Sequence, residues 1–250
     1  MTDSQLGIID WGIGGISIYQ LIKSRCGEVP IIYFSDTGAR PYGRMSSEEL
    51  VSRLDDIIAF LRSRGVTHLV VGCNAASTVI PLLKTGELKV HGVIDSAVSC
   101  VEKARPAELA LIGGRRTVLS GIYRRACADR GIKLTQRIAQ PLSGLIESGD
   151  VSSPELHEQC RRIIAPIKNY SHLLLACTHY PAIAPVIKKF VSTTTMIIDP
   201  AGELVEEVRR WGLSPSGRDI FYTTGRPEKM LMAALKAFGA KISRVTTVTI

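Results

Sequence analysis

A ten-residue pattern occurs twice in the chain. Residues 68–77 read HLVVGCNAAS and residues 172–181 read HLLLACTHYP, so each copy places a cysteine five residues after a histidine, behind a run of branched aliphatic side chains. An apolar run without polar alternation is typical of a strand covered on both faces, as in a parallel sheet flanked by helices. Ligands of such sheets bind beyond the carboxyl ends of the strands. The repeat therefore predicts two buried strands that end at Cys73 and Cys177, beside a binding site.

The elements around these two strands follow one order twice: strand, glycine turn, helix, strand, loop, helix, thiol strand. The first series has strands at 6–10 and 31–34, a helix at 16–24, and a second helix capped by Ser46 and Glu49. The second series has strands at 109–112 and 132–138 and helices at 117–130 and 154–167. A further helix is expected from about 76 to 84. The order predicts an α/β fold of two similar domains, each a mainly parallel sheet flanked by helices, with a site in the cleft between them.

Composition limits the classes of protein. A length of 250 residues suits one large domain or two of about a hundred residues. The chain has no apolar run near the roughly 18 residues of a membrane span and starts without a signal-peptide pattern, so we expect a cytoplasmic protein without membrane contact. None of the six cysteines forms a CxxC pair, which argues against zinc knuckles and dithiol redox motifs.

The chain is basic, with a net charge of +8. Such a charge would suit nucleic acid, but the basic residues are dispersed in pairs, several at helical spacing, and solvated helix faces explain most of them. The pairs are Arg115 and Arg116, Arg124 and Arg125, Arg161 and Arg162, Lys188 and Lys189, and Arg209 and Arg210. We therefore do not expect a nucleic-acid partner.

The glycine turn at 12–15 (GIGG) suggests a second alternative, a nucleotide site. It follows a first strand, and Asp36 lies about where a ribose-binding acid would. However, Ser17 replaces the third glycine of the dinucleotide motif, and Asp10 and Trp11 stand where phosphate oxygens would approach. Nucleotide binding is therefore disfavoured.

Two thiols facing each other across a cleft can perform acid–base chemistry. A thiolate that removes a proton from a carbon, with a thiol returning one to the opposite face, inverts that centre without a cofactor. Asp10 and His179 follow strand ends at the same edges and could manage these protons. Asn74 and Thr178 are expected to open helices whose free N–H groups suit a carboxylate. Together these residues predict a site for a small acid.

The two cysteines also allow a structural role or a metal site. A lone cysteine at a strand end usually fills a core, and only the duplicated context with polar residues behind each thiol favours catalysis. Zinc bound by Cys73, Cys177 and His179 stays open as well, although ligands this far apart in sequence have no diagnostic spacing.

Several motifs together carry a resemblance to a known family. They are 7–10 (GIID) with Gly12, Gly14 and Gly15, 33–36 (YFSD), 41–43 (PYG), 73–77 (CNAAS), 92–94 (GVI) and 177–181 (CTHYP). At these positions the chain resembles the cofactor-independent amino-acid racemases of the aspartate/glutamate racemase superfamily, particularly glutamate racemase.

The resemblance implies roles for individual residues. Cys73 and Cys177 correspond to the two acid–base thiols, Asp10 and His179 assist one on each side, and Glu147 matches a carboxylate near the second thiol. The residues that match substrate-binding positions are Pro41, Tyr42, Gly43, Asn74 and Thr178. No cofactor and no metal are implied. The family's two domains would correspond to 1–95 with 208–250, and to 96–207.

Two positions depart from the family pattern. Trp11 stands where glutamate racemases usually have serine, and Ala75 where they usually have threonine. Both flank the expected pocket and belong to its substrate-binding residues. If the indole points inward the pocket is shorter, which favours aspartate over glutamate; if it points outward, glutamate fits.

The sequence therefore predicts a racemase of an acidic amino acid, with aspartate slightly preferred to glutamate. The expected partners are this small substrate and a second copy of the chain in a homodimer. The alternatives are a superfamily isomerase or decarboxylase of a small diacid, and a non-catalytic binding or regulatory protein on the same scaffold.

Overall fold

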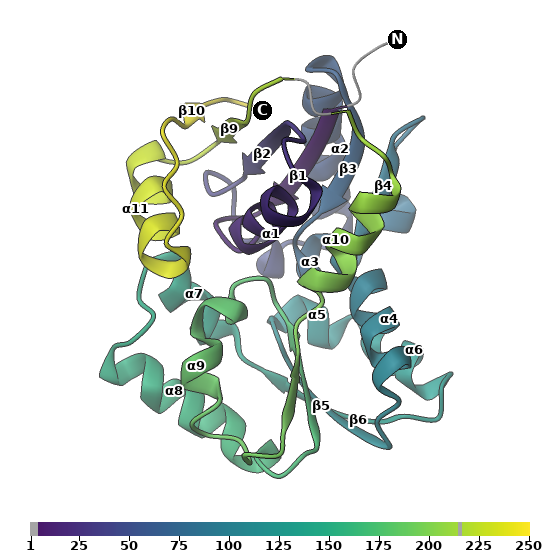
Figure 1. Cartoon of the computed structure of the whole chain (residues 1–250), viewed down its shortest axis with the longest axis vertical. Helices are drawn as coiled ribbons and strands as arrows, with labels where there is room; N and C mark the ends of the chain where they lie inside the picture. The colour runs from purple at the N-terminus through teal and green to yellow at the C-terminus, as the bar shows by residue number, and fades with distance from the viewer. Residues whose placement is uncertain (1–4, 215–216) are drawn as a thin grey trace.

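The computed structural model describes residues 5–214 and 217–250, so residues 1–4 and 215–216 of the predicted first domain lie outside the described residues. Within the described ranges the strands form two parallel sheets, one above the other in Figure 1. The strand order is β10-β9-β2-β1-β3-β4 in the first sheet and β6-β5-β7-β8 in the second. The first contains β1 (Gln5–Asp10), β2 (Ile31–Ser35), β3 (Val66–Val71), β4 (Lys89–Gly92), β9 (Ile220–Thr223) and β10 (Thr246–Thr247). The second contains β5 (Glu108–Gly113), β6 (Lys133–Ile138), β7 (His172–Ala176) and β8 (Met196–Ile198).

The two sheets share a topology. The consecutive strands β1 to β4 lie in the spatial order 2-1-3-4, and β5 to β8 repeat that order. The predicted fold class, two similar α/β units with parallel sheets, is therefore confirmed. The thiol strands β3 and β7 occupy equivalent central places, each paired with the first strand of its series. The domain boundaries near 95 and 208 stay a prediction.

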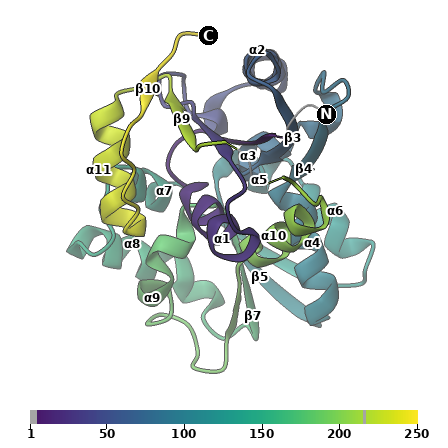
Figure 2. The same cartoon turned by 45° about the horizontal axis from the view of Figure 1, so that its top comes forward.

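Helices cover both faces of each sheet (Figures 1 and 2). On the first sheet, α1 (Ile16–Cys26), α10 (Ala201–Arg210) and α11 (Pro227–Phe238) share one core cluster, and α2 (Ser47–Ser63) covers the other face. On the second, α7 (Gln140–Glu147) and α8 (Pro154–Ile164) lie on one face, and α4 (Val93–Ala104) and α6 (Ile122–Ala128) on the other. The short helices are α3 (Asn74–Ser77), α5 (Arg115–Leu119), α9 (Ala184–Ile187), and the 3-10 turns at Tyr42–Arg44, Ile80–Leu82, Ala165–Ile167 and Tyr180–Ile183.

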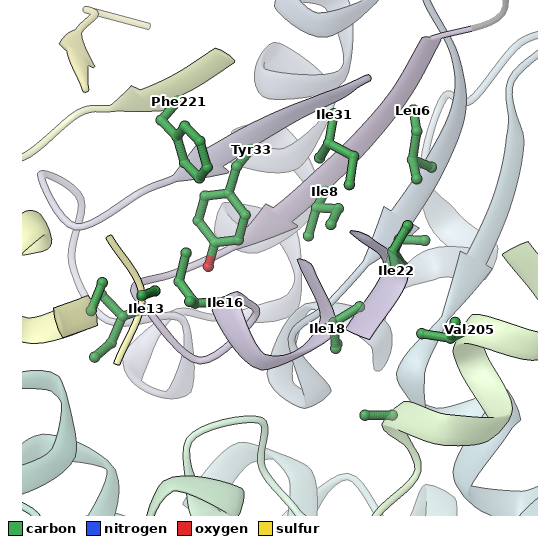
Figure 3. Close-up of a cluster of buried hydrophobic side chains, with 14 of the residues drawn as sticks. Leu6, Ile8, Ile13, Ile16, Ile18, Ile22, Ile31, Tyr33, Val205 and Phe221 are labelled. Atoms are coloured by element: carbon green, nitrogen blue, oxygen red, sulfur yellow. The ribbon is translucent and has the colours of Figure 1, made fainter. Parts of the chain in front are cut away.

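Strand β1 is the centre of the first sheet's core. Successive side chains of a strand point to opposite faces, so Ile8 packs toward α1 while Ile9 packs toward α2. Figure 3 shows Ile8 beside Ile31 and Tyr33, above Ile18 of α1. Both isoleucines of β1 are fully buried, which explains the apolar run without alternation.

The sequence prediction was wrong in three regions that lie near the cleft. The single helix expected at 117–130 is two helices, α5 (Arg115–Leu119) and α6 (Ile122–Ala128), separated at Gly121, whose φ is 70°. Residues between the predicted strand at 132–138 and the helix at 154 were assigned to a loop, but they contain α7 (Gln140–Glu147). The helix expected from 76 to 84 is instead α3 (Asn74–Ser77) followed by a separate 3-10 turn. Residues of α3 and α7 line the cavity between the sheets.

The carboxyl ends of the strands are aligned by backbone hydrogen bonds. In the first sheet, Asp36 N donates to Asp10 O at 3.0 Å and Gly72 N donates to Ile9 O at 2.9 Å. The second sheet has the corresponding bond from Ala139 N to Gly113 O, at 2.8 Å. The residues that follow the central strands are therefore held at one edge of each sheet.

Among the described residues, no helix is long and apolar enough to span a membrane.

Replacing Ile8 with alanine should lower the free energy of unfolding by about 2–5 kcal/mol, because the deleted carbons leave a cavity in a fully buried site. Urea unfolding measures this change. The control is Ile220→Ala in β9, where the side chain is 36% exposed and the loss should be at most about 1 kcal/mol. Equal losses in both variants would contradict the assignment of β1 to the core.

Candidate active site

A cavity of about 430 Å³ lies between the carboxyl edges of the two sheets. The first sheet's side of its lining is Asp10, Trp11, Pro41, Tyr42, Gly43, Arg44, Cys73, Asn74 and Ala75. The second sheet's side is Gly114, Arg116, Thr117, Gln140, Pro141, Ser143, Gly144, Ala176, Cys177, Thr178 and His179. Every site residue expected from the sequence lines this cavity except Glu147, which reaches it through His179.

Cys73 belongs to the first sheet's side of the cavity. It follows β3 by two residues and precedes α3, and its side chain is half-buried. Burial raises the pKa of the thiol well above its ordinary value, and the negative charge of Asp10 raises it further, while the N–H groups of Ala75 and Ala76 offset only part of this. At neutral pH Cys73 is therefore a thiol.

Asp10 connects the two halves at the base of the cavity. Its fully buried carboxyl group accepts a hydrogen bond from Trp11 N at 2.6 Å and another from the Thr178 hydroxyl at 3.0 Å. Burial raises the pKa of this carboxyl group, against the lowering effect of the His179 charge. The Thr178 bond ties the end of β1 to the residue after Cys177.

Cys177 starts a chain of three polar side chains on the second sheet's side. Its sulfur lies 3.7 Å from His179 Nδ1, and His179 Nε2 lies 2.7 Å from Glu147 Oε2. Burial alone would lower the pKa of His179, but its hydrogen bonds and attraction to Cys177 and Glu147 outweigh burial and raise the pKa well above the ordinary value. The imidazole is therefore held as a cation beside the second thiol.

The glycine turn after β1 allows these groups to approach. Glu147 Oε2 accepts a hydrogen bond from Ile13 N at 3.0 Å, and a Cβ atom on Gly12 would lie only 2.0 Å from that oxygen. A Cβ atom on Gly14 would lie 2.5 Å from the Thr178 hydroxyl and 2.7 Å from His179 Nδ1. The turn that resembles a dinucleotide loop therefore serves close approach of side chains from the other half.

Asn74 offers a free donor to a ligand. Its side-chain oxygen accepts a hydrogen bond of 2.7 Å from the Tyr123 hydroxyl, and its Nδ2 is buried with no partner in the described structure. A buried N–H group without a partner is costly unless a ligand satisfies it. Thr178 lies in the turn before a 3-10 helix and does not open a helix itself, contrary to the expectation for it.

The positions that depart from the family pattern both line the cavity. Trp11 is half-buried, and its indole N–H donates to Ala39 O at 3.2 Å, which fixes the ring against the 36–43 loop. Ala75 contributes only a methyl group. Neither position presents a side-chain hydroxyl to a ligand.

Asp36, the candidate ribose acid, is a structural residue. It is fully buried and accepts from Arg53 Nε at 2.9 Å and Arg53 Nη2 at 2.6 Å. It also accepts from the Tyr42 hydroxyl at 2.9 Å, so it orients the Pro41–Tyr42–Gly43 wall of the cavity. Because both carboxylate oxygens of Asp36 already accept hydrogen bonds, this residue is not available to bind a ribose, which further disfavours nucleotide binding. Within the described residues, no three His, Cys, Asp or Glu side chains are grouped so that they could hold a metal ion.

Sequence reasoning missed part of the cavity lining, above all the residues of α5 and α7. A signal for α7 was present, since Pro141 near the start of a helix is a common helix-start residue. The equivalence of the two series was a signal for Gly114 and Thr117, because they follow β5 as the glycine turn follows β1. Arg116 was grouped with solvated basic pairs, yet it lines the cavity while Arg115 is exposed.

We expect Glu147→Gln to lower the pKa of His179, because the amide removes the negative charge that stabilises the imidazolium. An NMR titration of the His179 ring measures it. A folded-state pKa above the ordinary 6.5 means that the pair stabilises the fold fully below pH 6.5 and loses this contribution as the pH rises through the raised value. The control is Glu155→Gln on the exposed start of α8, which should leave the titration unchanged. An unchanged His179 pKa in Glu147→Gln would contradict the assigned pair.

Gly12→Ala should disturb the same pair from the opposite side, since the added Cβ must displace Glu147. The expected results are a lower His179 pKa and a loss of about 1–3 kcal/mol in the free energy of unfolding. Gly202→Ala in α10 is the control, because its Cβ would find no atom closer than 3.7 Å. In the Glu147→Gln variant, adding Gly12→Ala should change the His179 pKa little. If the two substitutions lowered this pKa additively, the result would contradict the contact between Gly12 and Glu147.

The chain is similar to known proteins in sequence and in fold. The profile of the Asp/Glu/Hydantoin racemase family matches residues 6–208. The glutamate racemase of Desulforudis audaxviator (strain MP104C) is 31% identical over 216 residues, covering 84% of this chain and 79% of that protein. That of Thermoanaerobacter pseudethanolicus (strain ATCC 33223 / 39E) is 29% identical and covers 100% of this chain and 99% of its own length. The crystal structure of a glutamate racemase isoform from Bacillus anthracis matches with a TM-score of 0.90 at 26% identity, covering 100% and 99% of the two chains. The chain therefore belongs to the Asp/Glu/Hydantoin racemase family and is an isomerase.

Proposed function

We propose that this enzyme racemises an acidic amino acid, glutamate in the first place, by proton transfer between the α-carbon and two thiols without a cofactor. The observation that carries the proposal is the cavity with one half-buried thiol from each sheet, Cys73 and Cys177. Each thiol has its own buried polar neighbour, Asp10 on one side and His179 on the other.

The proposed reaction uses the two sulfurs on opposite faces of the substrate. A thiolate of Cys177 takes the α-proton, and the electron pair of the broken C–H bond moves into the α-carboxylate. The Cys73 thiol then gives its proton to the other face of the same carbon and becomes the thiolate. In the reverse direction the roles exchange. Asn74 Nδ2, which has no partner in the described structure, suits the α-carboxylate where negative charge accumulates.

The raised pKa of Cys73 supports a division of labour in the free enzyme. Burial and Asp10 keep this group protonated, so it starts as the acid. On the other side, the His179 cation lies 3.7 Å from the Cys177 sulfur and 2.7 Å from Glu147 Oε2, so a positive charge stands beside the second thiol. The chain Cys177, His179, Glu147 thus supplies the starting base.

Glutamate is the substrate that the relatives favour, since those reported above are named glutamate racemases. A cavity of about 430 Å³ has room for it, and the arginines in the lining, Arg44 and Arg116, favour a second carboxylate. Aspartate is the second candidate, carried by Trp11 and Ala75. The Trp11 indole, which is held against the 36–43 loop, takes up space in the cavity. This loss of space affects glutamate more than the shorter aspartate.

The diacid isomerase or decarboxylase and the non-catalytic scaffold protein are weaker candidates. A non-catalytic binding protein does not need two thiols that each have a polar neighbour able to exchange protons. We also propose that two copies of the chain form a homodimer.

Incubation in D₂O with single L- and D-amino acids, followed by NMR, tests this function. At low conversion of glutamate or aspartate, we expect deuterium at the α-carbon of the product enantiomer, while the remaining substrate keeps its α-proton. The reason is that one group removes the proton and another group delivers a deuteron from the solvent. Cys73→Ser and Cys177→Ser should each slow racemisation about 10²- to 10⁴-fold, the usual contribution of a positioned acid or base. The control is Cys26→Ser, whose sulfur faces Val205 O outside the cavity.

Absence of exchange with both acids would contradict the proposed function. Exchange that survives in the double variant Cys73→Ala/Cys177→Ala would contradict the assigned thiols and leave the family assignment intact.

A further inference from the structure

Arg116 lies at the boundary between the two halves of the molecule. It belongs to α5, which follows β5 of the second sheet and lies beside α3 of the first half in both views (Figures 1 and 2). Its guanidinium reaches three oxygens of the first half, each at 3.0 Å. They are Thr78 Oγ1 from Nε, Met45 O from Nη1 and Ser47 Oγ from Nη2.

All three partners of this guanidinium are neutral. No carboxylate of the described residues forms an ion pair with Arg116, although the side chain is half-buried and burial lowers the pKa of the group. Arginine nevertheless stays charged in proteins. A cation that is partly removed from water without a counterion is costly, and an anion in the cavity that Arg116 lines would compensate for it.

The guanidinium also has donors to spare. Of its five N–H groups, three are used by the neutral oxygens, which leaves one on each terminal nitrogen. The three bonds fix the plane of the group, so little side-chain entropy is lost when an anion binds. Such a fixed fork is suited to the two oxygens of a carboxylate.

The position relative to the reacting carbon agrees with a distal carboxylate. Cys73 is the residue before α3 and Thr78 is the residue after it, and the helical rise separates them by about 7.5 Å. One or two methylenes and a carboxylate can bridge that separation from a carbon beside Cys73. Trp11 and Ala75, which also line the cavity, present no side-chain hydroxyl to this carboxylate.

We propose that Arg116 binds the side-chain carboxylate of the substrate and makes this site selective for acidic over amide or neutral amino acids. The proposal rests on the proposed function and specifies which residue recognises the distal charge. In this arrangement the hydrogen bonds to Met45, Ser47 and Thr78 orient the guanidinium without neutralising it, so its positive charge can interact with the ligand.

Arg116→Gln tests the proposal, because glutamine keeps N–H donors for the first half but removes the charge. The measurements are the KM of the acid in the deuterium-exchange assay and the inhibition constant of the matching amide, glutamine for glutamate or asparagine for aspartate. We expect the KM of the acid to rise about 10- to 100-fold, as for loss of a charge-assisted hydrogen bond, with a smaller effect on kcat. The inhibition constant of the amide should change less than about threefold.

Three further variants separate charge recognition from a structural role. Arg116→Lys keeps the charge without the fork and should give an intermediate KM. Ser47→Ala removes one bond that holds the guanidinium and should preserve the preference for acid over amide. Arg115→Gln changes the exposed neighbouring arginine and should behave as the wild type. Thermal unfolding of each variant checks that the fold is retained.

Equal changes for acid and amide in Arg116→Gln, or no change in either, would overturn the role of Arg116 while the racemase function stands. A wild-type enzyme that exchanges only neutral amino acids would overturn it as well. A wild-type enzyme that exchanges no amino acid would contradict the proposed function itself, before any variant is compared.

Discussion

The contact on which the site depends is the insertion of Glu147 from the second half against the glycine turn of the first. One carboxylate oxygen accepts from Ile13 N and pairs with His179, so it fixes the distance between β1 and the second thiol loop. The bond from Thr178 to Asp10 acts in parallel at the base of the cavity. Both are charge-assisted and largely withdrawn from water, where loss of one partner leaves a costly unsatisfied group. The two similar sheets are thus joined through polar groups of the cavity to which we assign roles in the proposed reaction.

Most of the fold could be predicted from the sequence because parallel strands buried on both faces have a strong signature. The runs ending at Asp10, Cys73 and Cys177 identified the central strands, and the rule that ligands bind at carboxyl ends brought them to one site. Helix α2 could be predicted from its capping box, which the structure contains between Ser46 and Glu49. Patterns of this kind depend on neighbours in the sequence, which a single sequence displays.

The rest depended on contacts between distant segments. Helix α7 has Pro141, Gly144 and a following Ser148 and Gly149, which resemble a loop, so the resemblance alone identified Glu147. The close approach at Gly12 requires a carboxylate from the other half of the chain, which local patterns do not reveal. Arg115 and Arg116 look alike in sequence, and only the packing of α5 against the first half separates an exposed cation from one that lines the cavity.

The two thiols have unlike surroundings, although the two enantiomers of any substrate have equal free energies in water. Equal free energies require equal kcat/KM in the two directions, so the environments of Cys73 and Cys177 cannot favour one direction overall. The asymmetry consists of a half-buried thiol with a raised pKa on the side of Asp10 and a cation, His179, beside Cys177. In the proposed two-thiol reaction, a turnover in one direction leaves the protons on the opposite sulfurs, and they must be redistributed before the next turnover in that direction. We propose that His179 beside Cys177 and Asp10 on the side of Cys73 take part in that redistribution.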